Sequence, residues 1–299
     1  MRGVFTALVT PFDSKNQIDW AAYRALLKAQ KEAGISGVIP CGTTGESPTL
    51  RTDEKKKLIE EAVSFMKGSQ TSVFAGTGSF DTETTVEFSK WASGAGVQGV
   101  LVVTPYYNKP TQNGLLAHFR AVADAVQCTV MIYNVPGRTG QAIHPATLAQ
   151  LSKHPRIRAL KESSGSVSIL SDIQDAVALE GKDMDFFCGD DGLFIPMLSV
   201  GACGLVSVAS NIIPKTMVQL QTLFDGGKVQ QAAELHRKLY PLFRDLFIEA
   251  NPSPIKQMMA WRGLCAEHVR LPLVGMTEAN LATLKKTASK IDASIGGLQ

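Results

Sequence analysis

A lysine at the end of an apolar run is the side chain whose position most clearly suggests chemistry. Lys161 closes the segment Ile157-Arg-Ala-Leu-Lys161. A lysine that enters an apolar interior loses hydration in its charged form, and the neutral amine attacks ketone carbonyls. The protonated imine that results withdraws electrons, so the adjacent carbon can lose a proton and form a carbon–carbon bond. The alternative interpretation is a solvated strand-end lysine paired with Glu162 or another carboxylate.

Phenols and an arginine follow two other apolar runs. Tyr133 ends one run, and Tyr106 and Tyr107 follow another. Because a phenol can both donate and accept a proton, Tyr133 and Tyr107 are candidates for proton transfer, although tyrosines at strand ends also serve in packing. Arg138 comes after Pro136-Gly137 and could bind a carboxylate through two hydrogen bonds, or lie on the surface without a ligand.

The segment Gly42-Thr-Thr-Gly-Glu-Ser47 has the composition of an anion-binding loop. Its glycines let backbone N–H groups turn toward one point, and the hydroxyls of Thr43 and Thr44 add two donors. A substrate carboxylate would suit this loop. An ordinary turn with capping threonines is the alternative.

Metal and nucleotide chemistry have little support in the sequence. Asp190-Asp191 could bind a cation, but adjacent carboxylates after a strand also cap the following helix. No GxGxxG or GxxxxGK[ST] motif occurs, so we expect neither a cofactor nor a metal. The five histidines show neither HxH nor HxxxH spacing: His118, His144, His154, His236 and His268.

Alternating strands and helices would form a parallel sheet and bring these residues together at the C-terminal ends of its strands. Apolar runs such as Gly99–Val103 show no polar alternation, which predicts strands buried on both faces. Eight βα units favour a closed (β/α)8 barrel of the TIM type; a doubly wound sheet is disfavoured because Val9 is followed by Thr10-Pro11, without a glycine-rich turn. Catalytic groups of such barrels follow the strands. The predicted strands are Val4–Val9, Gly37–Cys41, Ser72–Gly76, Gly99–Val103, Thr129–Asn134, Arg158–Glu162, Asp185–Gly189 and Gly204–Val208.

Helical patterns separate these runs and then continue to the C-terminal part. In Thr52–Lys67, Thr52 is expected to cap the helix, Asp53 and Glu54 to complement its dipole, and Gly68 to end it. We expect a catalytic barrel over residues 1–225 and a helical region over residues 226–299, divided near Gly226-Gly227. The helices expected in that region are Val229–Ala250, Pro254–Arg262 and Thr277–Ile295.

Composition narrows the class of protein further. The chain has 299 residues, 44% of them hydrophobic, and a formal net charge of +3 without a basic run, so a nucleic acid or an anionic membrane is not an expected partner. No stretch has the length and apolarity of a membrane helix or a signal peptide, which predicts a cytoplasmic protein. Five scattered cysteines, with no CxxC pair, fit neither a disulfide framework nor a cysteine zinc site.

Three of the motifs together resemble those of a known family. Gly42-Thr-Thr-Gly-Glu46, Tyr133-Asn-Val-Pro-Gly-Arg-Thr-Gly140 and Lys161-Glu-Ser163 are similar to the dihydrodipicolinate synthase and N-acetylneuraminate lyase family of Schiff-base aldolases. The double threonine and Arg138 favour the branch that condenses pyruvate with L-aspartate 4-semialdehyde in lysine and diaminopimelate biosynthesis. The resemblance extends over further segments: Thr104-Pro-Tyr-Tyr-Asn108, Gly189-Asp-Asp191 and Asn251-Pro252.

The resemblance implies a role for each site residue. Lys161 would form the imine and Tyr133 would move protons. Thr43 would link Tyr133 to Tyr107, and the neighbouring subunit would supply Tyr107. That relay implies a homo-oligomer, in this family usually a tetramer built as a dimer of dimers.

The remaining roles concern substrate binding. Thr44 would hold the pyruvate carboxylate, and Arg138 the carboxylate of the semialdehyde. Gly189 and Val206 match positions near the lysine. Two alternatives stay open: another pyruvate-dependent Schiff-base aldolase or sugar-acid dehydratase, and a non-catalytic binding paralogue.

Feedback by lysine is expected to be weak or absent. In feedback-sensitive relatives the lysine pocket uses histidines, an asparagine and a glutamate. This sequence has Thr52, Lys55, Phe80 and Thr84 at those positions, which removes acceptors and adds a like charge.

Overall fold

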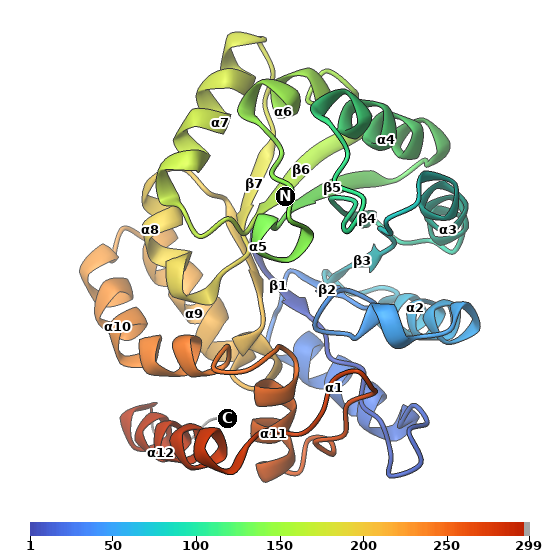
Figure 1. Cartoon of the computed structure of the whole chain (residues 1–299). Helices are drawn as coiled ribbons and strands as arrows, with labels where there is room; N and C mark the ends of the chain where they lie inside the picture. The colour runs from blue at the N-terminus through green and yellow to red at the C-terminus, as the bar shows by residue number, and fades with distance from the viewer. Residues whose placement is uncertain (296–299) are drawn as a thin grey trace. The chain divides into compact units, whose positions relative to one another are not determined.

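Eight parallel strands close into a barrel in the order in which they occur along the chain, in a computed structural model that describes residues 1–295 and the side chains of residues 1–291 (Figure 1). The predicted fold class is confirmed. The strands are β1 (Gly3–Ala7), β2 (Gly37–Ile39), β3 (Ser72–Gly76), β4 (Gly99–Val103), β5 (Thr129–Asn134), β6 (Ile157–Glu162), β7 (Asp185–Cys188) and β8 (Gly204–Ser207).

Helices alternate with the strands and then follow them. The α-helices are α1 (Trp20–Glu32), α2 (Thr52–Met66), α3 (Thr82–Gly94), α4 (Gln112–Ala125), α5 (Pro136–Thr139), α6 (Pro145–Leu151), α7 (Val167–Leu179), α8 (Phe194–Ser199), α9 (Pro214–Asp225), α10 (Val229–Asp245), α11 (Ser253–Trp261) and α12 (Glu278–Ile295). Short 3-10 turns occur as η1 (Ser47–Thr49), η2 (Asp191–Leu193) and η3 (Ala209–Asn211).

The chain forms two compact units, and the first is Met1–Arg2 with Ser72–Val206. In it β3 to β8 pair in succession, and Tyr133 of β5 lies in register with Lys161 of β6. Helices α3, α4, α6 and α7 pack side by side on the outer side of these strands (Figure 1). Val100 and Val102 of β4 are fully buried, although side chains of neighbouring residues point to opposite faces of a strand. The uninterrupted apolar run Gly99–Val103 therefore has the two-sided burial that its pattern predicts.

The second unit joins Gly3–Thr71 to the chain from Ser207 onward. Here β1 pairs with β2, α1 packs on α2, and α10 lies between α9 and α12. The apolar side chains Leu58, Ile59 and Ala62 of α2 are fully buried, as the spacing of these residues predicts.

Helix ends depart from expectation more than strand ends. The N-cap of α2 is Arg51 rather than Thr52, because the Glu54 carboxylate accepts the backbone N–H of Arg51 at 2.9 Å and so satisfies the donor at the start of the helix. The first C-terminal helix, α10, ends at Asp245 instead of Ala250. The division of the chain between residues 225 and 226 stays a prediction.

None of the helices that the structure describes is long and apolar enough to cross a membrane. All five cysteines are free thiols. Cys41 and Cys188 are buried, as expected for small apolar side chains, and the other three are half-buried.

Candidate active site

Lys161 and Tyr133 lie against each other on neighbouring strands. The Lys161 amine lies over the Tyr133 ring, 4.0 Å from its centroid, and each residue is only 6% exposed. Among the described residues, no carboxylate forms an ion pair with Lys161; its expected alternative partner, Glu162, instead accepts hydrogen bonds from Asn134 and Ser164. The structure therefore disfavours the solvated, ion-paired interpretation of this lysine.

A buried hydrogen-bond frame holds the two strand ends in place. The Asn134 side-chain amide donates to the Glu162 carboxylate at 2.8 Å, and its oxygen, Oδ1, accepts the backbone N–H of Ile143 at 3.1 Å. The backbone carbonyl of Tyr133 accepts both the N–H and the hydroxyl of Thr104, each at 3.0 Å. This frame aligns Tyr133 with Lys161, and no pattern in the sequence indicated a role for Asn134 or Thr104.

Gly189 provides the space beside the lysine. A Cβ at this position would lie 2.9 Å from Lys161 Cε and would collide with the Ser163 hydroxyl oxygen. The backbone N–H of Gly189 donates to the Glu162 carbonyl at 2.8 Å, which fixes this close approach. Val206 is buried in β8, the strand that pairs with β7. The predicted position of Gly189 near Lys161 agrees with this geometry.

Tyr107 lies in a loop with an unusual backbone. Its φ is +72°, a region that residues other than glycine rarely adopt, and its side chain is 92% exposed. The loop is tied down nearby, because Asn108 donates to the Phe80 carbonyl at 2.9 Å and the Tyr106 ring packs edge-on against Phe80. A loop held by these contacts therefore presents an exposed phenol.

The Arg138 loop lies close to the Tyr107 loop. Arg138 is exposed on the short helix α5, whose first residue, Pro136, supplies the φ that a helix start requires. Gly140 ends this helix with φ +69°, and a Cβ there would lie 2.8 Å from Lys109 Cε. The guanidinium is thus free to meet a ligand from solvent.

Thr43 and Thr44 belong to the other compact unit, in the loop between β2 and η1. Thr44 is buried, and its hydroxyl oxygen accepts a hydrogen bond from the Asn251 side-chain amide at 2.9 Å. Thr10 donates to the Gly45 carbonyl at 2.7 Å, which supports the same turn. Thr43 is half-buried, and its carbonyl accepts the Glu46 N–H at 3.1 Å.

A buried charge network anchors the end of this loop. Glu46 holds a left-handed backbone conformation (φ +56°), and its fully buried carboxylate meets the Lys256 amine at 2.5 Å. The other carboxylate oxygen of Glu46 accepts the backbone N–H of Arg270 at 2.9 Å. Burial lowers the pKa of Lys256, and Glu46 opposes that shift. No local pattern in the sequence predicts this pair, because its members stand 210 positions apart.

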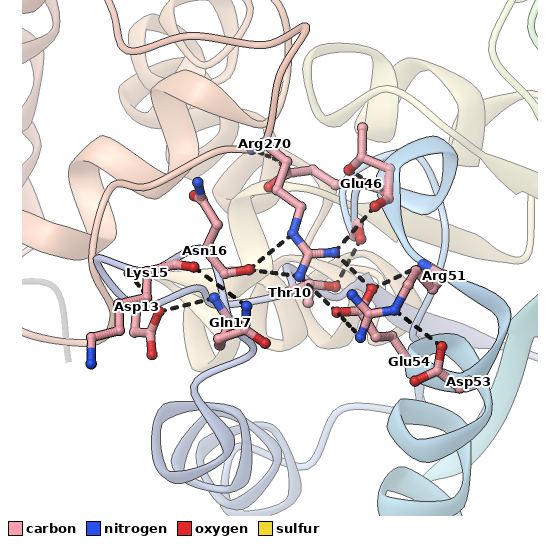
Figure 2. Close-up of polar contacts among 12 residues, drawn as sticks. Thr10, Asp13, Lys15, Asn16, Gln17, Glu46, Arg51, Asp53, Glu54 and Arg270 are labelled. Atoms are coloured by element: carbon pink, nitrogen blue, oxygen red, sulfur yellow. Dashed lines mark hydrogen bonds and ion pairs between the residues drawn. The ribbon is translucent and has the colours of Figure 1, made fainter.

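Arg270 extends the network to the start of α2, as Figure 2 shows. Its guanidinium donates to both Glu54 oxygens at 2.7 Å and to the Asn16 carbonyl at 2.7 Å. These contacts hold the pKa of the Glu54 carboxyl below its usual range. Lys256 and Arg270 each lie 4.2 Å from the centroid of the Phe12 ring, so one aromatic side chain contacts two cations.

The other chemical candidates have structural explanations. Asp190 accepts the N–H of Gly192 at 2.8 Å and caps η2, in line with the capping alternative. Burial raises the pKa of the Cys41 thiol to about 12 and that of the Cys203 thiol to about 12, which makes both poor nucleophiles. The described residues contain no group of three or more His, Cys, Asp and Glu side chains that could hold a metal ion.

A closed parallel barrel with a buried lysine against a phenol at adjacent strand ends defines a class: barrel enzymes whose candidate nucleophile is a lysine amine. A model of the Dihydrodipicolinate synthetase family matches residues 1–291, and the chain belongs to that family.

Individual relatives agree over nearly the full length. The chain is 44% identical to the 4-hydroxy-tetrahydrodipicolinate synthase of Endomicrobium trichonymphae, over 95% of this chain and 96% of that protein. The solved structure of the 4-hydroxy-tetrahydrodipicolinate synthase from Methylacidiphilum fumariolicum SolV superposes with a TM-score of 0.95 at 41% identity, covering 99% of this chain and 97% of that one. A chloride-inhibited dihydrodipicolinate synthase from Acinetobacter baumannii, solved in complex with pyruvate, gives a TM-score of 0.93 at 34% identity, covering 97% and 98%.

These comparisons confirm the predicted family, the predicted lyase class and the predicted 4-hydroxy-tetrahydrodipicolinate synthase function.

Proposed function

We propose that the chain condenses pyruvate with L-aspartate 4-semialdehyde through an imine on Lys161. The observation that carries this proposal is the buried Lys161 amine, 4.0 Å from the centroid of the Tyr133 ring and without an ion-pair partner among the described residues. An amine in this setting is nucleophilic when neutral, and a phenol beside it can supply the proton transfers that imine chemistry requires.

The proposed steps follow from that pair. The Lys161 amine attacks the pyruvate carbonyl carbon, the Tyr133 phenol gives its proton to the departing hydroxyl, and loss of water leaves a protonated imine beside the Tyr133 phenolate. Tyr133 takes a proton from the methyl carbon, and the C–H electrons move into an enamine because the positive nitrogen accepts them. The enamine carbon attacks the aldehyde, and a proton from Tyr133 neutralises the alkoxide. The amine of the semialdehyde portion then attacks the imine carbon, the C–N bond to Lys161 breaks, and Lys161 leaves as a neutral amine with a proton that comes from the attacking nitrogen.

The substrate-binding assignments rest on family resemblance together with local geometry. Thr44 holds the pyruvate carboxylate, with Thr43 linking Tyr133 to Tyr107 through hydroxyl groups. Arg138 binds the carboxylate of the semialdehyde, a role that its exposure and its charge permit. Gly189 and Val206 contribute backbone and wall to the pocket of the lysine.

Borohydride reduction in the presence of pyruvate tests the central step. Peptide mass mapping should locate a reduced pyruvate adduct on Lys161, and the Lys161→Ala variant should show none. An adduct on another lysine, or no adduct at all, would remove the mechanism. A panel of aldehydes in a turnover assay then separates this activity from that of another pyruvate-dependent aldolase or a sugar-acid dehydratase.

The proposed assembly is a homotetramer built as a dimer of dimers. Tyr107 supports it, because an exposed phenol on a constrained loop is suited to enter a neighbouring subunit. Mixing Tyr107→Phe subunits with Lys161→Ala subunits should restore part of the activity that each variant lacks. No restoration in mixed oligomers would place Tyr107 outside the neighbour's site.

Weak lysine feedback and a cytoplasmic location complete the proposal. Steady-state rates at increasing lysine concentrations should stay nearly constant, whereas clear and saturable partial inhibition would show a working lysine pocket.

A further inference from the structure

Among the described residues, the Thr44 hydroxyl has one buried side-chain partner, and the chemistry of that partner determines whether the hydroxyl donates or accepts. Asn251, in the turn before α11, directs its amide nitrogen at Thr44 Oγ1 over 2.9 Å. Both residues are at least 95% buried, so water does not compete freely for this contact. An amide nitrogen only donates, and a hydroxyl that accepts it keeps its own hydrogen for another acceptor.

The other atom of the same amide strengthens the argument. Asn251 Oδ1 is buried and has no hydrogen-bond partner among the residues that the structure describes. Rotating the amide by half a turn would place this acceptor on Thr44, where it would capture the hydroxyl hydrogen. The observed orientation leaves an acceptor unsatisfied and keeps the Thr44 hydroxyl available as a donor. Unsatisfied buried groups of this kind require an explanation beyond packing.

We propose that Asn251 is a positioning residue that keeps the Thr44 hydroxyl in its donor state toward the substrate carboxylate. A carboxylate only accepts hydrogen bonds, so a hydroxyl already committed to an acceptor on residue 251 could not bind it. This inference rests on the proposed function, which gives Thr44 the pyruvate carboxylate.

The surroundings hold Asn251 at the required place. Lys256, in the first turns of α11, forms the 2.5 Å contact with Glu46, two residues beyond Thr44. Ser253 donates to the Val274 carbonyl at 3.0 Å and secures the start of the same helix. The helix that follows Asn251 is thus attached directly to the Thr43–Thr44 loop, and the amide cannot drift away from the hydroxyl without disturbing a buried ion pair.

A double-mutant cycle tests the inference, with borohydride trapping on Lys161 at increasing pyruvate concentrations as the readout. Asn251→Leu should raise the half-saturating pyruvate concentration about fivefold to tenfold, the effect of one lost hydrogen bond. In a Thr44→Val background the same replacement should change it less than twofold, because the hydroxyl that Asn251 orients is already absent. Half-saturation by the semialdehyde should stay within twofold of wild type.

Two further variants keep the test decisive. Asn251→Asp preserves shape but presents only acceptors, so it should weaken pyruvate binding in the wild-type background even if the leucine variant fails to fold. If Asn251→Asp acts by capturing the Thr44 hydroxyl, it should weaken pyruvate binding much less in the Thr44→Val background. If it acts by repulsion between the new carboxylate and the pyruvate carboxylate, the loss of binding would be the same in both backgrounds. Asn280→Ala, which removes an amide that donates to Glu249 at 2.7 Å, is the matched control and should leave pyruvate binding unchanged.

The inference would be overturned if the Asn251 variants raised the half-saturating pyruvate concentration by the same factor in both Thr44 backgrounds, or if they bound pyruvate as wild type does. Either result would leave the proposed function intact. Absence of a Lys161 adduct in the wild-type protein would overturn the proposed function itself, and the inference with it.

Discussion

The space beside Lys161 exists because residue 189 is a glycine and has no Cβ. At Gly189 the backbone comes so close to Ser163 and Lys161 that no other side chain fits without movement. An amine that must reach a carbonyl carbon depends on such placement, because displacements near 1 Å already lower rates strongly.

We expect Gly189→Ala to reduce turnover at least a hundredfold, because the new methyl must displace Lys161 Cε or Ser163. Turnover and borohydride trapping measure the effect. Gly94→Ala, at the end of α3 with nothing within 4 Å of the new Cβ, should keep full activity and gain up to about 1 kcal/mol in stability. Full activity in Gly189→Ala would show that the Lys161 side chain accommodates the added methyl group.

Arg138→Ala should impair use of the semialdehyde far more than imine formation, because the proposed role of this exposed arginine concerns the second substrate only. Loss of one charge-assisted interaction costs about 1.5 to 3 kcal/mol, which corresponds to a 10- to 150-fold rise in half-saturation. Initial rates with each substrate varied in turn provide the measurement. A collapse of pyruvate binding with unchanged semialdehyde dependence would assign Arg138 to the wrong substrate.

The sequence predicted which residues follow the strands, but not what holds them. Lys161, Tyr133 and Gly189 were identifiable because apolar runs that end in polar residues mark the strand ends of a barrel. Asn134 and Thr104 were missed, because their hydrogen bonds to Glu162 and Tyr133 are made across strands. Such partners follow from strand register, and residue types alone do not reveal register.

Among the elements, strand positions were more predictable than helix ends. The predicted bounds of β3, β4 and β5 agree with those observed, because glycine or polar residues flank each apolar run. Helix α2 begins at Thr52 as predicted, but its N-cap is Arg51, since the capping interaction comes from the Glu54 side chain and not from Thr52. Capping contacts of this kind compete within one helical turn, so helices with similar sequences can begin at neighbouring residues.

The contact between α3 and α4 contains a buried histidine. His118 of α4 lies 3.0 Å from the Thr82 hydroxyl of α3 through Nδ1, and its Nε2 is buried without a partner among the described residues. Burial lowers the pKa of His118 to about 4, against a small opposing effect of Asp81. The imidazole is therefore neutral at physiological pH.

This histidine should make stability fall as the pH drops from 6.5 toward 4. In that window the unfolded chain, with a histidine pKa near 6.5, binds a proton that the folded protein does not, so protonation favours unfolding. The difference amounts to about 3 kcal/mol over the window. Thermal unfolding of His118→Gln should show a flatter dependence on pH than wild type.

His144→Gln serves as the matched control, because His144 is exposed and the same replacement there removes no buried imidazole. Its pH dependence should follow that of the wild-type protein. Equal slopes for His118→Gln and wild type would mean that His118 is hydrated in solution.

The second compact unit combines an N-terminal and a C-terminal portion of the chain. Lys256 and Arg270 reach Glu46 and Glu54, and all of these contacts are buried or nearly so. Removing one member of a buried pair leaves an uncompensated charge, which costs about 3 to 5 kcal/mol.

Lys256→Met should therefore lower the free energy of unfolding by about 3 to 5 kcal/mol, because the fully buried Glu46 carboxylate loses its counter-charge. Urea unfolding followed by circular dichroism measures the change. The double variant Glu46→Gln with Lys256→Met should recover most of the loss, since neither side chain is then charged. A single variant within 1 kcal/mol of wild type would show that solvent reaches Glu46.

The separation of Glu46 and Lys256 along the chain implies a delay during protein synthesis, because Glu46 is made well before Lys256. At about 5 to 20 residues per second, synthesis of the 210 positions between them takes roughly 10 to 40 s. Throughout that interval the carboxylate has no buried counter-charge, so we expect the Gly42–Ser47 segment of the nascent chain to stay hydrated and open to proteases. Ribosomes stalled before residue 256 should display a cleavable segment there, and those stalled well beyond it a protected one. The loop assigned to substrate binding would therefore be among the last parts of the nascent chain to fold.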